Sequence, residues 1–327
     1  MTPFTLEHKV DPNLSRPTRI HRVPSIEAEK LWIKREDELS SGISGSKLRK
    51  YSSLIPHLIK ERVETVGMIG GPNSNNLVGL AQILRENGIK PIAFVRQAAD
   101  KQIRGNALLL DMLLDKSELI LIPREQWSQV GDTAREYLEK QNTRSHLLEE
   151  GCSGFEALPG AMSLAKDILR NEMEIEQVFS RIYIDSGTGM SATGLILGLE
   201  SMAPPTPREI VVTLIADCEE RFNAQLSRFR SQLSEKIKRV IEPQVELRFL
   251  SPILCPKFGS INASVIQECR RVAKTLGLVM DPTYSAKHYM TAKADLLSNP
   301  NSNRSLFIFN GSALGLMGFQ DRLSSRA

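Results

Sequence analysis

A lysine in an unusual setting is the first residue whose surroundings suggest chemistry. Lys47 follows the serines and glycines of 41–46 and opens a stretch with helical spacing at 47–61. Small residues let a flat ring approach the backbone closely, and a lysine beside a helix N-terminus can have a depressed pKa and form an imine. A solvated lysine next to a flexible loop is the alternative, since most lysines lie at the surface. The segment therefore marks Lys47 as a candidate nucleophile.

A second candidate segment, at 70–76, joins an apolar run to a stretch with helical spacing. It contains Asn73, Ser74 and Asn75. Their hydroxyl and amide groups, together with exposed backbone N–H groups, suit a carboxylate placed at a helix N-terminus. Serine and asparagine are also favoured helix caps, so a plain N-cap is the alternative.

A third segment, at 186–194, has the composition of an anion cradle. Glycines let backbone N–H groups converge, and the dipole of the following helix favours an anion such as phosphate. The segment is neither a Walker A loop, which needs Gly-Lys-Ser/Thr, nor a clean GxGxxG, and a structural turn is the alternative. The candidate phosphate-binding residues are Gly187, Thr188, Gly189, Met190, Ser191, Ala192 and Thr193.

A fourth segment, at 281–287, offers an aromatic ring and two small hydroxyls at a turn. Tyr284 and Ser285 are its candidate functional residues. A buried core tyrosine followed by a capped helix would give the same pattern. This segment gains meaning only in combination with the other three.

Short apolar runs alternate with amphipathic stretches along most of the chain. Strands of continuous apolar character indicate parallel sheets covered on both faces, hence an α/β fold. The predicted strands lie at 31–37, 63–69, 91–96, 119–123, 180–187, 208–217 and 305–311.

Five segments taken in order resemble the tryptophan-synthase-β-like (fold type II) enzymes that use pyridoxal 5′-phosphate (PLP). The closest resemblance is to the branch with 1-aminocyclopropane-1-carboxylate (ACC) deaminase and D-cysteine desulfhydrase, over roughly residues 15–320. The matching segments are KRED at 34–37, GSKLRK at 45–50, GGPNSN at 70–75, SGTG at 186–189 and DPTY at 281–284.

The resemblance implies an architecture of two lobes, each an open, mostly parallel sheet flanked by helices, with PLP in the cleft between them. The larger, PLP-binding lobe would comprise residues 1–49 and 161–327, and the smaller lobe residues 50–160. A homodimer is the implied assembly.

The resemblance also implies roles for the candidate residues. Lys47 would carry PLP as a Schiff base, and Lys47, Ser74 and Tyr284 would have catalytic roles. Asn75 would contact the ring oxygen, residues 187–193 the phosphate, and Ser285 the pyridine nitrogen. The implied substrate-binding residues are Asn73, Ser74, Asn75, Phe258, Tyr284 and Asn310.

Departures from the family pattern lie around the substrate. ACC deaminases have a glutamate where this chain has Ser285, and a serine supplies no charge to the pyridine nitrogen, so the cofactor would be a weaker electron sink. Phe258 replaces a tyrosine, Asn310 lies in a segment that reads HTGG in the family, and Asn76 replaces a histidine.

These departures favour α,β-elimination, in which a good leaving group removes the negative charge. We therefore expect a PLP-dependent lyase that converts a small amino acid to a 2-oxoacid and ammonia, similar to D-cysteine desulfhydrase. The alternatives are an ACC deaminase and a weakly catalytic, PLP-holding or regulatory protein.

Composition narrows the remaining classes. The chain has 327 residues and a net charge of +4 with interspersed charges, so no nucleic-acid partner is expected. No apolar run reaches 18 residues and no signal peptide opens the chain, so we expect no membrane partner and a cytoplasmic location. The four cysteines form no CxxC motif and the five histidines are scattered, so no metal site is expected.

Overall fold

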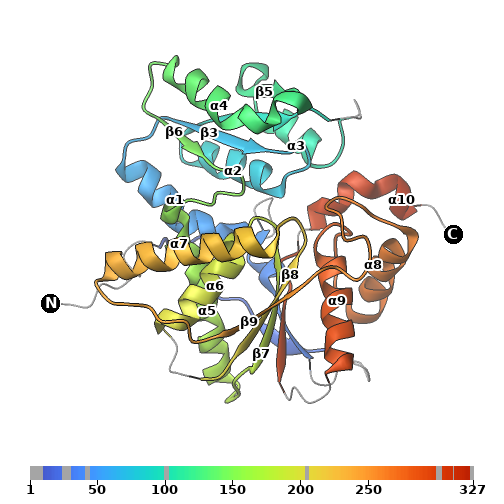
Figure 1. Ribbon diagram of the computed structural model, residues 1–327. Helices are drawn as coiled ribbons and strands as arrows, with labels where there is room; N and C mark the ends of the chain where they lie inside the picture. Colours follow the sequence, from blue (N-terminus) through green and yellow to red (C-terminus); the bar gives the residue numbers. More distant parts are fainter. Residues whose placement is uncertain are drawn as a thin grey trace.

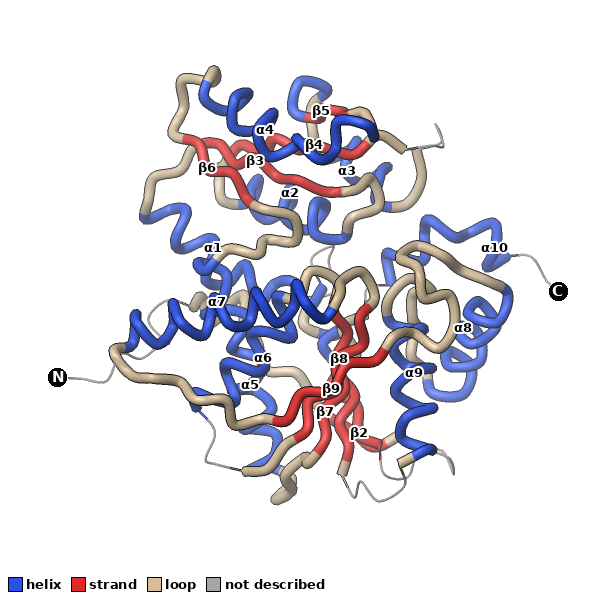
Figure 2. Tube along the Cα trace, in the orientation of Figure 1, coloured by secondary structure: helices blue, strands red, loops and turns tan. Residues whose placement is uncertain are grey.

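The computed structural model has two lobes, one on top of the other in Figure 1, and Figure 2 shows that each contains its own sheet. The described residues are 10–23, 31–40, 45–98, 103–202, 206–299, 304–311 and 313–324.

The smaller sheet has four parallel strands in the order β5-β4-β3-β6. Its strands are β3 (Thr65–Gly70), β4 (Lys90–Arg96), β5 (Leu119–Ile122) and β6 (Ser145–Leu148). The helices of this lobe are α2 (Asn75–Glu86), α3 (Asn106–Leu113) and α4 (Val130–Glu139).

Both faces of this sheet are buried, which explains the continuous apolar character of its strands. In β4, Ala93 and Val95 pack into the core that contains α2, whereas Ile92 and Phe94 pack into the core that contains α4. Alternate residues of a strand point to opposite faces, so a strand between two helical layers must be apolar at nearly every position.

The larger sheet has six strands in the order β1-β2-β10-β7-β8-β9, all parallel except for the edge strand β1. Its strands are β1 (Ile20–Arg22), β2 (Leu31–Lys34), β7 (Arg181–Ser186), β8 (Glu209–Leu214), β9 (Glu246–Leu250) and β10 (Ser305–Ile308).

Helices cover both faces of the larger sheet as well. One core contains residues of α5 (Leu158–Glu174), α6 (Met190–Met202) and α7 (Glu219–Ile237), and the other contains residues of α8 (Ala263–Leu276) and α9 (Ser285–Ser298). The remaining helices are α1 (Leu48–Lys60), which packs against α5, and the short α10 (Gln320–Ser324). The predicted α/β class with two helix-flanked sheets is confirmed.

The predicted lobe limits, at residues 50 and 160, fall inside α1 and α5. Since these two helices pack against each other, contacts between the lobes are made within regular structure and not at an exposed linker. The division into residues 50–160 and the rest of the chain stays a prediction.

The predicted strand at 31–37 was too long, because β2 ends at Lys34 and a 3-10 helix follows at Glu36–Glu38. The reason is a buried ionic cluster. The guanidinium of Arg49 donates to Glu36 Oε1 (2.8 Å) and to Asp167 Oδ2 (2.7 Å), and Lys34 donates to the same Asp167 oxygen (2.6 Å). Turning the chain at Glu36 lets its carboxylate meet Arg49, two residues after Lys47.

None of the described helices is both long and apolar enough to cross a membrane.

Candidate functional site

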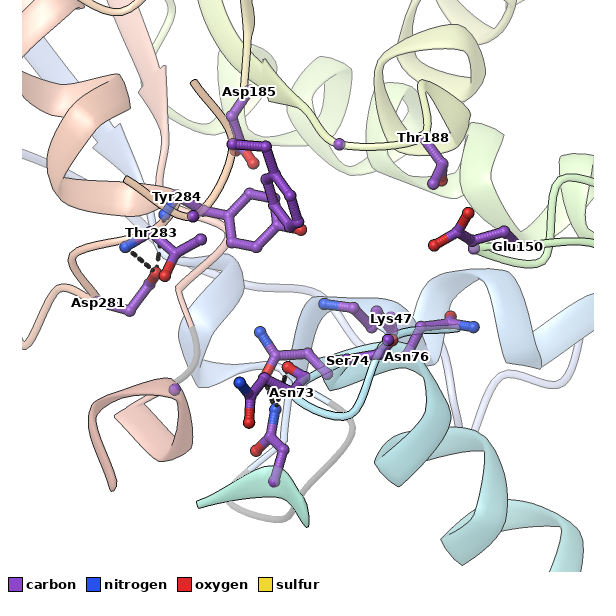
Figure 3. A pocket seen from close by; sticks show the side chains of 18 of the residues that line it. Lys47, Asn73, Ser74, Asn76, Glu150, Asp185, Thr188, Asp281, Thr283 and Tyr284 are labelled. Atoms are coloured by element: carbon purple, nitrogen blue, oxygen red, sulfur yellow. Dashed lines mark hydrogen bonds between the residues drawn. The ribbon is translucent and has the colours of Figure 1, made fainter. Parts of the chain in front are cut away.

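A cavity of about 560 Å³ opens between the two lobes, at the carboxyl ends of their strands. Figure 3 shows side chains from both lobes pointing into it. The cavity lies where ligands bind in open parallel sheets, and its volume is typical of small-molecule sites. The predicted site residues that line it are Lys47, Asn73, Ser74, Asn75, Gly187, Thr188, Gly189, Met190, Ser191, Phe258, Tyr284, Ser285 and Asn310.

Lys47 is the last residue of a short 3-10 helix, Gly45–Lys47, which continues directly into α1. Its ammonium end points into the cavity (Figure 3). Burial lowers the pKa of Lys47, and the carboxylates of Asp185 and Asp281 oppose that shift. A lowered pKa increases the fraction of neutral amine, which is the form that attacks a carbonyl carbon.

The N-terminus of α6 forms one end of the cavity. Gly189, just before the helix, has φ of +80°, and a Cβ at this position would lie 2.6 Å from Gln225 Nε2. A residue with a side chain would therefore be both strained and crowded here. The loop exposes backbone N–H groups of a 13-residue helix to the cavity, an arrangement that favours an anion.

Two of the predicted phosphate-binding residues, Ala192 and Thr193, are not among the lining residues of the cavity. Both are buried within α6, and Thr193 Oγ1 accepts a hydrogen bond from Gln225 Nε2 (3.2 Å). The turn of the helix directs these two side chains into the protein. Residues 187–191 therefore line the cavity, whereas Ala192 and Thr193 lie behind it.

α6 is fixed in place by very close packing on α5. A Cβ added to Gly194 would lie 2.5 Å from Ala161 Cβ, and one added to Gly198 would lie 2.5 Å from Ala165 Cβ. These glycines allow the two helices to approach at backbone distance. The position of the anion-binding end is therefore set by the packing of α6.

Lys50 is a site residue to which the sequence assigned no role. It is buried, lines the cavity, and donates hydrogen bonds to Gly151 O (2.6 Å) and Asn76 Oδ1 (3.1 Å). Gly151 packs directly against Thr188, so Lys50 lies near the anion-binding loop. Burial lowers the pKa of Lys50 to about 8. Only its place in the KLRK segment, one helical turn after Lys47, could have indicated it.

The Asn73–Asn75 segment forms the N-terminus of α2. Ser74 is the N-cap, and its Oγ accepts a hydrogen bond from Leu77 N (3.3 Å). Asn106 Nδ2 donates to Asn75 Oδ1 (2.7 Å) and to Asn73 O (2.9 Å), which fixes the loop. The plain N-cap and the carboxylate site are thus compatible, because the capped helix end faces the cavity.

Tyr284 and Phe258 form an aromatic wall, with their ring centroids 5.8 Å apart. Burial raises the pKa of Tyr284 well above the usual range, and nearby carboxylates add to the shift. Its phenol is therefore a neutral hydrogen-bond donor. Phe258 is 53% exposed, so one part of this wall is open to solvent.

Ser285 lines the cavity, but its hydroxyl already has two partners. It donates to Asp281 Oδ2 (2.6 Å) and accepts from Asp281 N (2.8 Å). The backbone N–H groups of Thr283 and Tyr284 donate to the other oxygen of Asp281. The predicted role of Ser285 at the pyridine nitrogen stays a prediction.

Asp185, at the end of β7, is the second site residue that the sequence did not indicate. It lines the cavity, and its Oδ1 accepts a hydrogen bond from Asn310 Nδ2 (2.8 Å). Burial raises the pKa of Asp185, against the effects of Asn310 and the Lys47 charge. In the sequence, the position of Asp185 between an apolar strand and a glycine-rich loop is only a weak indication that it belongs to the site.

The cavity fits PLP on several independent features. A phosphate matches the N-terminus of α6 beside Lys50, and the carbonyl carbon of the cofactor matches the amine of Lys47. The left-handed backbone at Gly189 also suits a loop whose N–H groups converge on a closely held anion.

Comparison with known proteins gives relatives over nearly the whole chain, although no family model matches it. A putative 1-aminocyclopropane-1-carboxylate deaminase of Thermotoga maritima is 26% identical over 296 residues, which cover 90% of this chain and 92% of the relative. A D-cysteine desulfhydrase of Serratia proteamaculans is 24% identical over 322 residues, covering 93% of each chain.

Solved structures agree with this result at the level of the fold. The structure of an ACC deaminase homologue superposes with a TM-score of 0.81 at 22% identity and covers 99% of both chains. That of O-ureido-L-serine synthase has a TM-score of 0.66 at 13% identity, covering 98% of this chain and 96% of the other. The resemblance predicted from the sequence is confirmed.

Proposed function

We propose that this chain is a PLP-dependent lyase that acts on a small amino acid by α,β-elimination, giving a 2-oxoacid and ammonia. D-cysteine is the substrate we favour, and sulfide is then the leaving group. The observation that carries the proposal is the position of Lys47, across one cavity from the glycine-rich N-terminus of α6. Relatives named for D-cysteine and for ACC support the same class of reaction.

The residues divide the work of binding between the two ends of the cavity. The N-terminus of α6 and Lys50 hold the phosphate, and Lys47 holds the cofactor covalently. The N-terminus of α2, capped by Ser74, receives the substrate carboxylate through its backbone N–H groups. The amino acid would then lie between the N-terminus of α2 and Lys47, which both line the cavity.

Proton transfer is then the task of the polar side chains. When bound, PLP withdraws electrons from the α-carbon of the amino acid. Lys47, whose lowered pKa increases the fraction of neutral amine, would accept the α-proton. Tyr284, whose pKa is raised by burial, would donate a hydrogen bond to the departing β-group.

We also propose that the protein is a homodimer and that it is located in the cytoplasm. Both proposals rest on the resemblance of the whole chain to the fold type II enzymes that act on small molecules. Sedimentation of the purified protein at several concentrations measures the assembly.

A screen of amino acids tests the function. Purified protein reconstituted with PLP should release pyruvate and sulfide from D-cysteine, and pyruvate from β-chloro-D-alanine. Lys47→Ala, reconstituted in the same way, is the matched control and should lose this activity by more than about 100-fold. A protein that holds PLP but turns over no D- or L-amino acid would instead be a PLP-holding or regulatory protein.

ACC deaminase is the second candidate, and the Thermotoga maritima relative favours it. Opening of the cyclopropane ring gives 2-oxobutyrate, so the two activities are measured separately in one screen. If the protein releases 2-oxobutyrate from ACC faster than it releases pyruvate from any D-amino acid, ACC deaminase becomes the favoured function.

A further inference from the structure

Asp185 is an acid in the cavity for which the proposed function gives no use. Figure 3 shows its carboxyl group on the Tyr284 side of the cavity, away from Thr188 and the anion-binding end. Among the described side chains, only Asn310 donates a hydrogen bond to it. Asp185 and Lys47 both line the cavity, so the two groups face the same space.

The position of Asp185 is fixed from two sides. It is the penultimate residue of β7, and Asn310 follows the neighbouring strand β10, so the two residues lie at adjacent strand ends. Ser46 Oγ, next to Lys47, donates to Asn310 O (3.2 Å). A chain of contacts therefore connects the Lys47 segment, through Asn310, to the carboxyl group of Asp185.

The other two acids that line the cavity have different surroundings. Asp281 is engaged by Ser285 and by backbone N–H groups of its own turn. Glu150 lies beside Thr188, at the end of the cavity that receives the phosphate (Figure 3). Of the three acids, Asp185 lies away from the phosphate end of the cavity, and one of its carboxyl oxygens has no hydrogen bond from a described side chain.

A comparison of PLP with the cavity leaves the pyridine nitrogen without a partner. We match the phosphate to the N-terminus of α6, the carbonyl carbon to Lys47 and the ring oxygen to Asn75. Asp185, held by Asn310, is among the lining residues that remain. Ser285 is a poor match, because its single proton is donated to Asp281.

Resting on the proposed function, we propose that Asp185, held by Asn310, is the partner of the pyridine nitrogen, in place of Ser285. With the cofactor bound, the carboxyl proton of Asp185 would move to the nitrogen, so that the O–H bond is broken, an N–H bond is formed, and a carboxylate would stand beside the positively charged ring. Burial favours the protonated carboxyl group in the empty cavity, and the positive charge of the ring would stabilise the carboxylate after the transfer.

This pairing widens the range of substrates. A protonated pyridine stabilises negative charge on the α-carbon more strongly than a neutral one. Reaction then depends less on a good leaving group than a serine partner would require. The substrate class therefore includes small amino acids with poor β-leaving groups, such as D-serine, beside D-cysteine.

The test uses the protein reconstituted with PLP labelled with ¹⁵N at the pyridine nitrogen. The ¹⁵N chemical shift should be that of a pyridinium in the unchanged protein and in Ser285→Ala, and that of a neutral pyridine in Asp185→Asn. A neutral signal in the unchanged protein, or an unaltered signal in Asp185→Asn, overturns the proposal. If Asp185→Asn fails to fold, Ser285→Ala decides, because loss of the pyridinium signal there identifies Ser285 as the partner.

Binding of the 1-deaza analogue of PLP gives a second readout. The unchanged protein should bind PLP at least about tenfold more tightly than the analogue, as expected for a charge-assisted hydrogen bond. Asp185→Asn should discriminate by less than about threefold, and Ser285→Ala should discriminate fully. If the unchanged protein and both variants show the imine absorbance band but the pyridine nitrogen is unprotonated in each of them, only the role of Asp185 is refuted. If the unchanged protein shows no imine band, the proposed function itself is refuted.

Discussion

At the scale of single residues, burial sets the protonation of the groups around the cavity. It lowers the pKa of the two lysines, Lys47 and Lys50, and raises the pKa of Asp185 and Tyr284. A larger fraction of each amine is thus neutral and able to attack a carbonyl carbon, and the two oxygen acids stay protonated to a higher pH. A cavity that accepts an aldehyde, an anion and an amino acid uses each of these changes.

Lys50 provides a pH test of this account. Below about pH 8 its side chain is charged in the folded protein and attracts the phosphate, and above that pH the charge is lost. Affinity for pyridoxine 5′-phosphate, which has no aldehyde, should therefore fall as the pH rises through 8. In Lys50→Met, the affinity measured by calorimetry should be lower at neutral pH and change less with pH.

Lys47→Ala is the matched control for that experiment, because Lys47 also has a lowered pKa. We expect this variant to keep the fall in affinity above pH 8. If the fall disappears in Lys47→Ala and persists in Lys50→Met, the phosphate contact belongs to Lys47 and not to Lys50.

At the scale of elements, two features place the reactive residues. The glycines of α6 bring its N-terminus to the cavity, and the ionic cluster around Asp167 fixes the start of α1. Both features lie inside the protein, and neither is among the residues that line the cavity. The accuracy of the site therefore depends on packing in the larger lobe.

Gly189→Asp tests the anion-binding end. The new side chain would be built toward Gln225 and Asp217, beside the N-terminus of α6, and its negative charge would oppose the binding of a phosphate there, because like charges placed close together cost several kcal/mol. PLP affinity measured by equilibrium dialysis should fall by on the order of 100-fold relative to Gly189→Asn, which adds similar bulk without charge. Equal retention of PLP by both variants would exclude this loop from the site.

Arg49→Met tests the ionic cluster. Removal of the guanidinium leaves the buried Glu36 without its ion pair and takes one of three cations from Asp167, and breaking a buried pair in this way costs about 3–5 kcal/mol. We expect a loss of that size in the free energy of unfolding by urea. Arg170→Met is the control, because Arg170 pairs with the same Asp167 from a more exposed position and should cost less than about 1 kcal/mol. Equal losses would mean that burial of the cluster contributes nothing.

At the scale of the whole molecule, two sheets of parallel strands direct their carboxyl ends toward one cavity. This topology explains why much of the site could be predicted. Loops that follow the strands of one parallel sheet lie together at its carboxyl edge. The loop with Ser74 follows a strand of the smaller sheet, the loop with Gly187 follows a strand of the larger sheet, and the two meet because both edges face the same cavity.

The parts that the sequence did not predict depend on side-chain direction. Ala192 and Thr193 follow the anion-binding loop in sequence, yet the turn of α6 points them into the protein. Asp185 has no motif around it, and its position beside Lys47 arises only when β7 and β10 pair. The partner of the Ser285 hydroxyl, Asp281, is likewise a matter of turn geometry.

The most direct test of the central claim is to locate the lysine that carries the cofactor. The protein reconstituted with PLP should show the absorbance of an imine, and reduction with borohydride should fix the pyridoxyl group on the peptide that contains Lys47. Lys47→Ala should lose both the absorbance and the label. A label on another lysine of the cavity region, such as Lys50 or Lys287, or the absence of any imine in the unchanged protein, would contradict the assignment.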